Sequence, residues 1–123
     1  MIKGLAVTAG VLVLGAASLL GATSASANPT MWVRQDLQVP GCTGQQQILE
    51  GYEGSSHEYQ QGAVTSSGDN CEVQIIQFIN GNRDATSDWY FIYTLPYYDG
   101  PTFQDQVCLE NTSTGKQDCS TLY

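Results

Sequence analysis

The chain has 123 residues, with twelve acidic and four basic side chains and a formal net charge of −8. This length allows one compact domain, and it is too short for a leader followed by two domains with ordinary cores. The few scattered cations cannot form the dense basic patch that phosphate groups require. The composition therefore argues against nucleic acid and anionic membranes as partners.

Residues 1–27 have the pattern of a cleavable secretory signal peptide. Lys3 precedes an apolar stretch from Leu5 to Leu20, and the small residues Ala25-Ser26-Ala27 come directly before the expected cleavage point. No basic stop-transfer cluster follows, so we expect no membrane anchor after cleavage. The predicted mature domain, residues 28–123, keeps three cations and all twelve carboxylates, a formal charge of −9. A short signal of this kind is typical of bacterial export, and we expect a secreted, extracellular protein.

Four cysteines remain in the predicted mature domain, and an oxidising compartment favours two disulfides over free thiols. Three pairings are possible in principle. A hairpin that turns at residues 113–114 would place Cys108 opposite Cys119, which leaves Cys42 to pair with Cys71. On the simple chain-entropy model, closing these two loops stabilises the domain by about 2.8 and about 3.6 kcal/mol respectively.

Alternation of apolar and polar residues is the main structural signal, and it starts directly after the signal peptide. In the predicted strand 31–39, strict alternation divides the side chains between two faces. One face carries Met31, Val33, Leu37 and Val39, and the other carries Trp32, Arg34, Asp36 and Gln38. Pro40-Gly41 is expected to end this strand.

Further short strands are expected along the rest of the domain, separated by turn-forming residues. The polar run 80–88 is interpreted as a reversal, and residues 89–95, apolar on both faces, are expected to pair with the strand before that run. Between 103 and 110, Asp105 falls on the same face as Val107 and Leu109. The predicted strands cover residues 47–52, 57–64, 71–79, 89–95, 103–110 and 116–122.

This pattern predicts an all-β domain: a small antiparallel β-sandwich or barrel of six to seven short strands, held by two disulfides. No segment has a good helical period. Only residues 45–52 have a composition that also tolerates helix.

No catalytic constellation is recognisable, and we assign no catalytic residue. The single histidine, His57, stands beside Glu58 and after Ser55-Ser56. Neighbouring residues on a strand point to opposite faces, so these side chains are not expected to converge as a triad. Disulfide-bonded cysteines are not available as nucleophiles.

Oxygen-bearing side chains alternate in the polar run, superficially as in a calcium loop, at Asn80, Asn82, Asp84 and Asp88. A calcium loop requires glycine at its sixth position and a bidentate glutamate at its twelfth. Here glycine comes second and Phe91 is twelfth. We therefore expect a plain hairpin, with no metal and no cofactor.

Aromatic residues are the most informative group, because they are dense for so small a domain. If the sheets leave one face open, some of these rings can form a contact surface; if both faces are covered, they are core. The candidate binding residues are Trp32, Trp89, Tyr90, Tyr93, Tyr97 and Tyr98.

Three functions are compatible with these features, and the sequence leaves the oligomeric state open. The first is a secreted non-catalytic binding protein, an enzyme inhibitor or another extracellular interaction domain, whose contact surface lies within residues 89–98. The second is a carbohydrate-binding domain that uses the same aromatic residues on a polysaccharide. The third is a small hydrolase that uses His57 or paired carboxylates. The expected partner is thus an extracellular protein or a polysaccharide.

Overall fold

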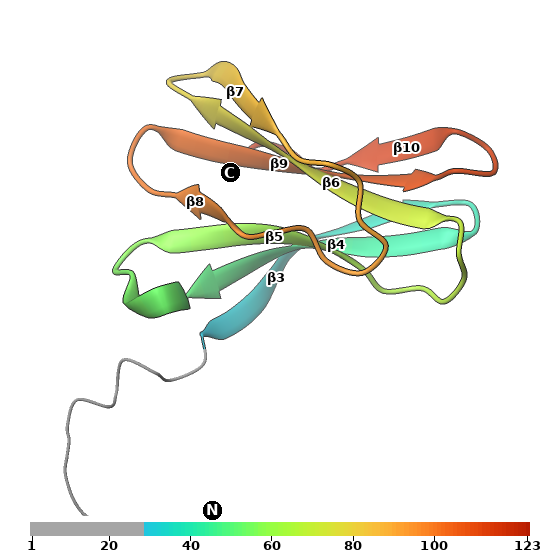
Figure 1. The fold of residues 1–123 in the computed structure, drawn as a ribbon, viewed down its shortest axis with the longest axis horizontal. Helices are drawn as coiled ribbons and strands as arrows, with labels where there is room; N and C mark the ends of the chain where they lie inside the picture. Colours follow the sequence, from blue (N-terminus) through green and yellow to red (C-terminus); the bar gives the residue numbers. More distant parts are fainter. Residues whose placement is uncertain (1–28) are drawn as a thin grey trace, which may run out of the picture.

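The computed structural model describes residues 29–123. The predicted signal peptide, residues 1–27, lies outside the described residues. Two sheets of four antiparallel strands each pack face to face as a sandwich (Figure 1). The predicted fold class is therefore confirmed.

The first sheet has the order β3-β4-β5-β8, and the second has the order β10-β9-β6-β7. Figure 1 shows them as a lower layer, blue to green with β8 in orange, and an upper layer, yellow to red. Within residues 29–123, a 3-10 turn, η2 (Tyr52–Gly54), follows β4. The strands are β3 (Thr30–Val39), β4 (Cys42–Glu50), β5 (Glu58–Val64), β6 (Cys71–Ile79), β7 (Asn82–Thr86), β8 (Tyr97–Asp99), β9 (Phe103–Asn111) and β10 (Lys116–Cys119).

The core lies between the two sheets and is built from alternate residues of four strands. In the parts of these strands that form the core, every second side chain points inward, as a half-solvated antiparallel sheet requires. The buried cluster consists of Leu37, Val39, Cys42, Cys71, Val73, Ile75, Val107 and Leu109, with Val64 and Tyr97 packed against it.

A bulge in β3 changes the faces predicted for that strand. Val33 pairs with Gln47 and Gln35 pairs with Gln46, so Arg34 is one residue more than the partner strand can match. An extra residue reverses the alternation on either side of it. Strict period-two alternation through this strand was therefore the wrong expectation.

The bulge separates the two pairs of apolar residues that the sequence placed on one face. Leu37 and Val39 are buried in the core, whereas Met31 and Val33 are 46% and 39% exposed. Trp32, predicted on the opposite face from Leu37, lies instead on the inward face, opposite the buried Ile48 of β4.

Eight strands form within residues 29–123, rather than six or seven, because two short edge strands escaped prediction. The reversal predicted for residues 80–88 is confined to Asn80-Gly81, and β7 follows at once with exposed side chains apart from Ala85. An edge strand with so little burial carries no apolar alternation. β8 is only three residues long and follows Pro96 directly.

The apolar segment 89–95 is not a regular strand, which corrects the sequence prediction. Only two isolated bridges occur there, Tyr90 with Val73 of β6 and Tyr93 with Ala63 of β5. The segment does pair with β6, as expected, but at a single residue. Apolar character on both faces indicated a central strand, whereas here it belongs to a segment that crosses from one sheet to the other.

Both predicted disulfides are present. Cys42–Cys71 joins β4 to β6 and so links the two sheets through the core, with the Cα atoms 5.6 Å apart. Cys108–Cys119 joins directly opposed residues of the neighbouring strands β9 and β10. One bridge thus ties the layers together, and the other reinforces a hairpin.

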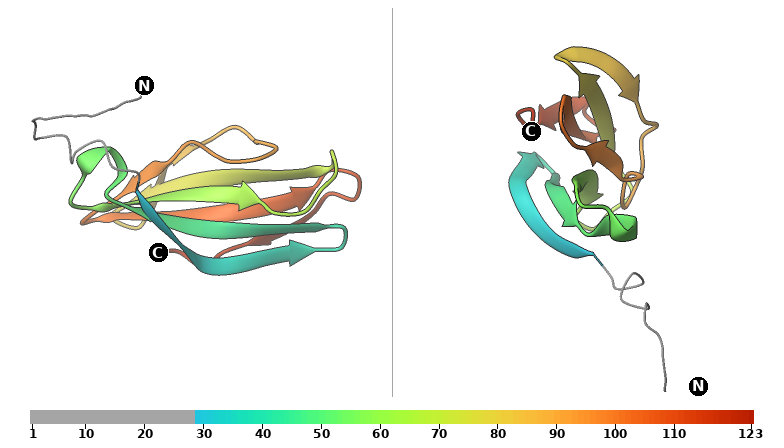
Figure 2. Two further views of the ribbon diagram at one scale, coloured as in Figure 1. Left: turned by 90° about the horizontal axis from the view of Figure 1, so that it is seen from below. Right: turned by 90° about the vertical axis from the view of Figure 1, so that its left-hand side faces the viewer.

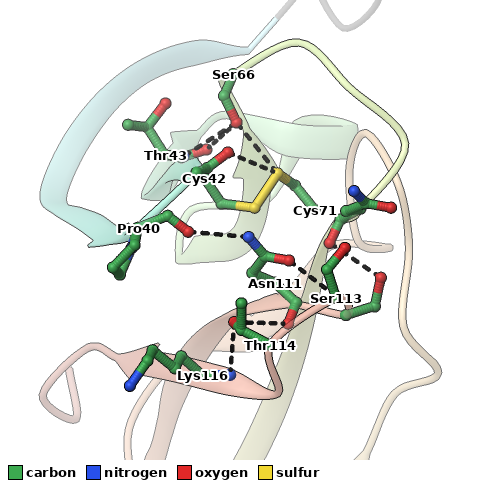
Figure 3. The surroundings of a disulfide bond; sticks show 12 residues. Pro40, Cys42, Thr43, Ser66, Cys71, Asn111, Ser113, Thr114 and Lys116 are labelled. Carbon is green, nitrogen blue, oxygen red and sulfur yellow. Dashed lines mark hydrogen bonds between the residues drawn. A yellow bond between two sulfur atoms is a disulfide. The ribbon is translucent and has the colours of Figure 1, made fainter.

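Asn111 connects two turns beside the intersheet disulfide, as Figure 3 shows. Its Nδ2 donates to the carbonyl oxygen of Pro40 at 2.9 Å, and its Oδ1 accepts from the backbone N–H of Ser113 at 2.9 Å. A buried amide with both ends hydrogen-bonded fixes the position of the β3–β4 turn relative to the β9–β10 turn.

Gly62 allows the two sheets to approach closely in the centre of the sandwich. A Cβ atom at this position would lie 2.7 Å from Cγ1 of Val107 and 3.3 Å from Cβ of Val73. Gly62→Ala is therefore expected to destabilise the domain by about 1–3 kcal/mol through overpacking. Urea denaturation measures this, with Gln104→Ala on the exposed side of β9 as a control. Equal midpoints for the two variants would contradict the close packing.

Candidate functional site

Residues 87–96, here called the connector, join β7 of the second sheet to β8 of the first. In Figure 1 they form the orange segment that descends from the upper layer to the lower one, and both views of Figure 2 show them outside the two layers. At the first sheet, the backbone of Val64 donates to the carbonyl of Ile92 at 2.9 Å. At the second, Tyr90 and Val73 exchange two backbone hydrogen bonds of 2.8 and 2.9 Å.

Thr94 anchors the connector from its inner side. Its side chain is only 3% exposed, and its Oγ1 accepts from the backbone N–H of Gly62 at 2.9 Å. Its own N–H donates to the Gly62 carbonyl, also at 2.9 Å. The connector is therefore held by backbone bonds to both sheets and by one buried side chain.

Around this anchor, the connector exposes a group of large apolar side chains. Phe91, Ile92, Tyr93 and Leu95 are 63%, 64%, 56% and 61% exposed. They form the densest run of exposed large apolar residues within 29–123, and we call them the apolar ridge. Contiguous exposed apolar side chains of this kind are a common feature of binding sites.

The backbone of Tyr93 is also turned outward. The bonds from Val64 to Ile92 and from Thr94 to Gly62 flank the bridge between Tyr93 and Ala63. In an antiparallel ladder this is the non-hydrogen-bonded pair, whose N–H and C=O point away from the partner strand. Tyr93 therefore presents both its ring and its peptide groups to the exterior.

The aromatic residues predicted as one binding surface lie in different places. Tyr93 is exposed on the ridge, while Trp89 and Tyr90 are half-buried beside it. Tyr97 packs against the core and Tyr98 belongs to a separate cluster. Only part of the predicted set thus shares one surface. Phe91, Ile92 and Leu95 fall within the predicted contact range 89–98 but were not among the named candidates.

Tyr98 lies in a cluster of aromatic rings at one end of the first sheet. Tyr52 and Tyr59 are 4.9 Å apart between ring centroids at 55°, Tyr59 and Tyr98 are 5.6 Å apart at 82°, and Tyr98 and Phe103 are 5.0 Å apart at 88°. Such tilted and edge-to-face pairs are typical of aromatic packing. Because the rings are not coplanar, they do not form a flat platform.

Trp32 is a further exposed aromatic residue, apart from the connector in the chain. Its Nε1 donates to Oε2 of Glu50 at 2.8 Å, and its ring meets that of Tyr123 edge-on at 6.1 Å. The guanidinium of Arg34 lies over the same tyrosine ring, 4.7 Å from its centroid. Trp32 is 36% exposed and is held by these neighbours.

A buried polar network continues inward from Arg34, between the sheets. Arg34 Nη1 donates to Oε1 of Gln46 at 2.8 Å, and Nε2 of Gln46 donates to Oε1 of Gln60 at 2.7 Å. Nε2 of Gln60 in turn donates to the main-chain oxygen of Tyr123 at 2.7 Å. Both glutamine side chains are fully buried.

Asp105 of β9 lies at the inner end of this network. Its side chain is fully buried, and neither carboxylate oxygen has a hydrogen-bond partner among the described residues. Burial, together with the charge of nearby Asp99, raises the pKa of Asp105 to about 8. The pKa of Asp99 is itself raised to about 6, chiefly by burial, although a hydrogen bond with Gln60 opposes the change. Asp105 is therefore protonated in the folded domain at neutral pH.

Sequence reasoning placed Asp105 correctly on the apolar face of its strand but drew nothing from it. An acid between core-facing positions was a usable signal, because a buried carboxyl group must either be paired or be neutral.

The remaining candidate residues do not converge within residues 29–123. His57 is exposed and packs edge-on against Tyr98 at 5.8 Å, while Asn82 and Asp84 lie on β7. No cluster of three or more His, Cys, Asp or Glu side chains in this range has a geometry that could hold a metal ion. The same range contains no helix long and apolar enough to cross a membrane.

No protein-family model, curated protein or solved structure matches this chain. The molecule is therefore defined by its architecture, a disulfide-linked β-sandwich of two four-stranded sheets with an apolar ridge on the segment between them. The disulfides are compatible with an extracellular protein.

Proposed function

We propose that this chain is a secreted, non-catalytic binding domain, and that its connector binds another protein through the apolar ridge. The exposure of Phe91, Ile92, Tyr93 and Leu95 is the observation that carries the proposal. When a partner covers four large apolar side chains that the folded domain leaves in water, the free energy of the system falls.

The anchoring of the connector supports this function. Backbone bonds at Tyr90, Ile92 and Thr94 hold the segment in place before any partner arrives. A surface that is already ordered loses little conformational entropy on binding, so more of the contact energy appears as affinity.

The chemistry of the ridge favours a protein over a polysaccharide. Sugar rings stack on flat aromatic faces, whereas Ile92 and Leu95 offer branched aliphatic groups. The tyrosine cluster around Tyr59 and Tyr98 has rings at 82° to each other, which also gives no flat surface for a glycan chain. The charge of −9 on residues 28–123 further favours a partner whose apolar contact is surrounded by basic residues.

The triple variant Phe91→Ser, Ile92→Ser, Leu95→Ser tests the proposal. The mature domain, residues 28–123, is immobilised and used to capture proteins from culture medium, and the binding of the captured protein is then measured by calorimetry. We expect the variant to weaken binding by about 30-fold or more, because buried apolar anchors dominate such contacts.

Met31→Ser with Val33→Ser is the matched control, since it also removes exposed apolar groups, from the outer face of β3. This control is expected to bind as the wild type does. Equal affinity of the triple variant and the wild type would contradict the proposal. It would also be contradicted if the wild type and the triple variant both sedimented with cellulose, chitin or starch.

A further inference from the structure

We propose that the connector binds in the substrate groove of an extracellular peptidase and inhibits it, with the ring of Tyr93 in a primary pocket that accepts aromatic side chains. This inference rests on the proposed function and names the class of partner. Four features of the connector support it.

The first feature is that the ridge is linear. Its exposed side chains, Phe91 to Leu95, come from five consecutive residues rather than from several strands. A broad, flat interface draws on about 20–30 residues from each side. A short protruding segment instead matches a groove that accepts one extended chain.

The second feature is the outward backbone of Tyr93. The two hydrogen bonds to β5 are made by its neighbours Ile92 and Thr94, so the peptide groups of Tyr93 remain free to pair with another chain. Recognition by strand addition takes its affinity from such main-chain bonds and its specificity from pockets for alternate side chains. Tyr93 and Phe91, two positions apart, supply the alternate side chains.

The third feature is the absence of charge from the connector between Trp89 and Pro96. A pocket with an acidic residue at its base selects lysine or arginine, whereas an apolar slot selects aromatic side chains. The connector offers aromatic and aliphatic side chains and no lysine or arginine, so we expect a peptidase with chymotrypsin-like or subtilisin-like specificity as the target.

The fourth feature distinguishes an inhibitor from a substrate. The peptide bond between Tyr93 and Thr94 is held from both sides, because Ile92 bonds to Val64, and Thr94 bonds to Gly62 through its N–H and its Oγ1. A groove-bound segment fixed in this way resists the rearrangement that hydrolysis requires. Because folding has already ordered the segment, it loses little conformational entropy when it binds.

Inhibition assays with chymotrypsin, subtilisin and trypsin test the inference, using the mature domain and the variant Tyr93→Lys. The wild type is expected to inhibit chymotrypsin or subtilisin and not trypsin. Tyr93→Lys is expected to raise the inhibition constant for that peptidase by about 30-fold or more and to gain inhibition of trypsin. Met31→Lys, which adds the same charge at another exposed position, should change neither.

Failure of this inference can be distinguished from failure of the proposed function. If the wild type inhibits neither chymotrypsin nor subtilisin, the inference is wrong. The proposed function nevertheless stands if the triple serine variant binds the captured protein more weakly than the wild type does. Rapid cleavage between Tyr93 and Thr94 without inhibition, detected by mass spectrometry, also overturns it. If the triple variant binds as the wild type does, both are wrong.

Discussion

Asp105→Asn is expected to abolish most of the loss of stability that the wild-type domain undergoes between pH 6 and pH 8. The folded domain holds the proton of Asp105 up to about pH 8, whereas an unfolded aspartate releases it near 3.8. Protonation therefore stabilises the fold fully below pH 4, and this contribution is lost as the pH rises through 8. At about 1.4 kcal/mol per pH unit, the loss from pH 6 to 8 is on the order of 3 kcal/mol.

Asp99 adds to the same trend at lower pH. Its pKa is raised to about 6, so its contribution disappears between about pH 4 and pH 6. Wild-type stability should thus fall more steeply below pH 6, where both groups act, than above it. Asparagine at position 105 is neutral, polar and of similar size, so the variant should match the wild type below about pH 4 and exceed it by a growing margin up to about pH 8.

Denaturant unfolding at pH 5, 6, 7, 8 and 9 measures this difference. Asp84→Asn on β7 serves as the control, because Asp84 is exposed and the substitution removes the same formal charge. Parallel stability curves for the wild type and Asp105→Asn would show that the buried carboxyl group does not titrate differently in the folded and unfolded domain.

Removal of the intersheet disulfide is the second substitution with a large expected effect. Cys42→Ala with Cys71→Ala opens a loop closed over a sequence separation of 29, which costs about 3.6 kcal/mol of chain entropy. Both cysteines are 2% exposed and belong to the core, so the smaller alanines add a packing loss. For a domain of this size, the combined loss is a large share of the total stability.

Cys108→Ala with Cys119→Ala is the matched comparison. That bridge closes a sequence separation of only 11 and joins strands that already pair. Its removal costs about 2.8 kcal/mol of stability on the same model. Differential scanning calorimetry should therefore give the lowest melting temperature for the Cys42/Cys71 variant. A larger loss for the Cys108/Cys119 variant would contradict the role of the intersheet bridge.

Much of the fold could be predicted from the sequence where burial repeats at every second residue. Val73, Ile75, Val107 and Leu109 lie in the core because their strands alternate without interruption. The disulfide pairing followed from the short hairpin around residues 113–114. In each case one local rule was sufficient.

The errors arose where tertiary contacts override local pattern. Nothing in the residues around Arg34 indicates a bulge, since the bulge depends on pairing with Gln46 and Gln47 of another strand. β7 has almost no buried residues, so alternation could not reveal it. The connector has the composition of a central strand. It crosses between the two sheets because its backbone bonds to β6 at one end and to β5 at the other.

The candidate site shows the same division. Sequence reasoning located the region of the ridge within residues 89–98, because the aromatic residues there exceed what a small core needs. It could not decide which side chains remain exposed, since that depends on which backbone groups of the connector bond to each sheet. Tyr97 is covered and Phe91 is not, although both follow apolar or aromatic neighbours.

The connector also determines the order in which the sandwich can be assembled. β3, β4 and β5 are consecutive antiparallel strands and can pair as soon as they are made. The free edge of β5 is covered only by Ile92–Thr94 and β8, which follow two strands of the other sheet. Any nascent chain that has not reached this point carries an open edge prone to intermolecular mispairing. During vectorial emergence of the polypeptide, the late docking of a single short stretch thus closes the edge of the first sheet, whereas β6 waits for β9, which follows later still.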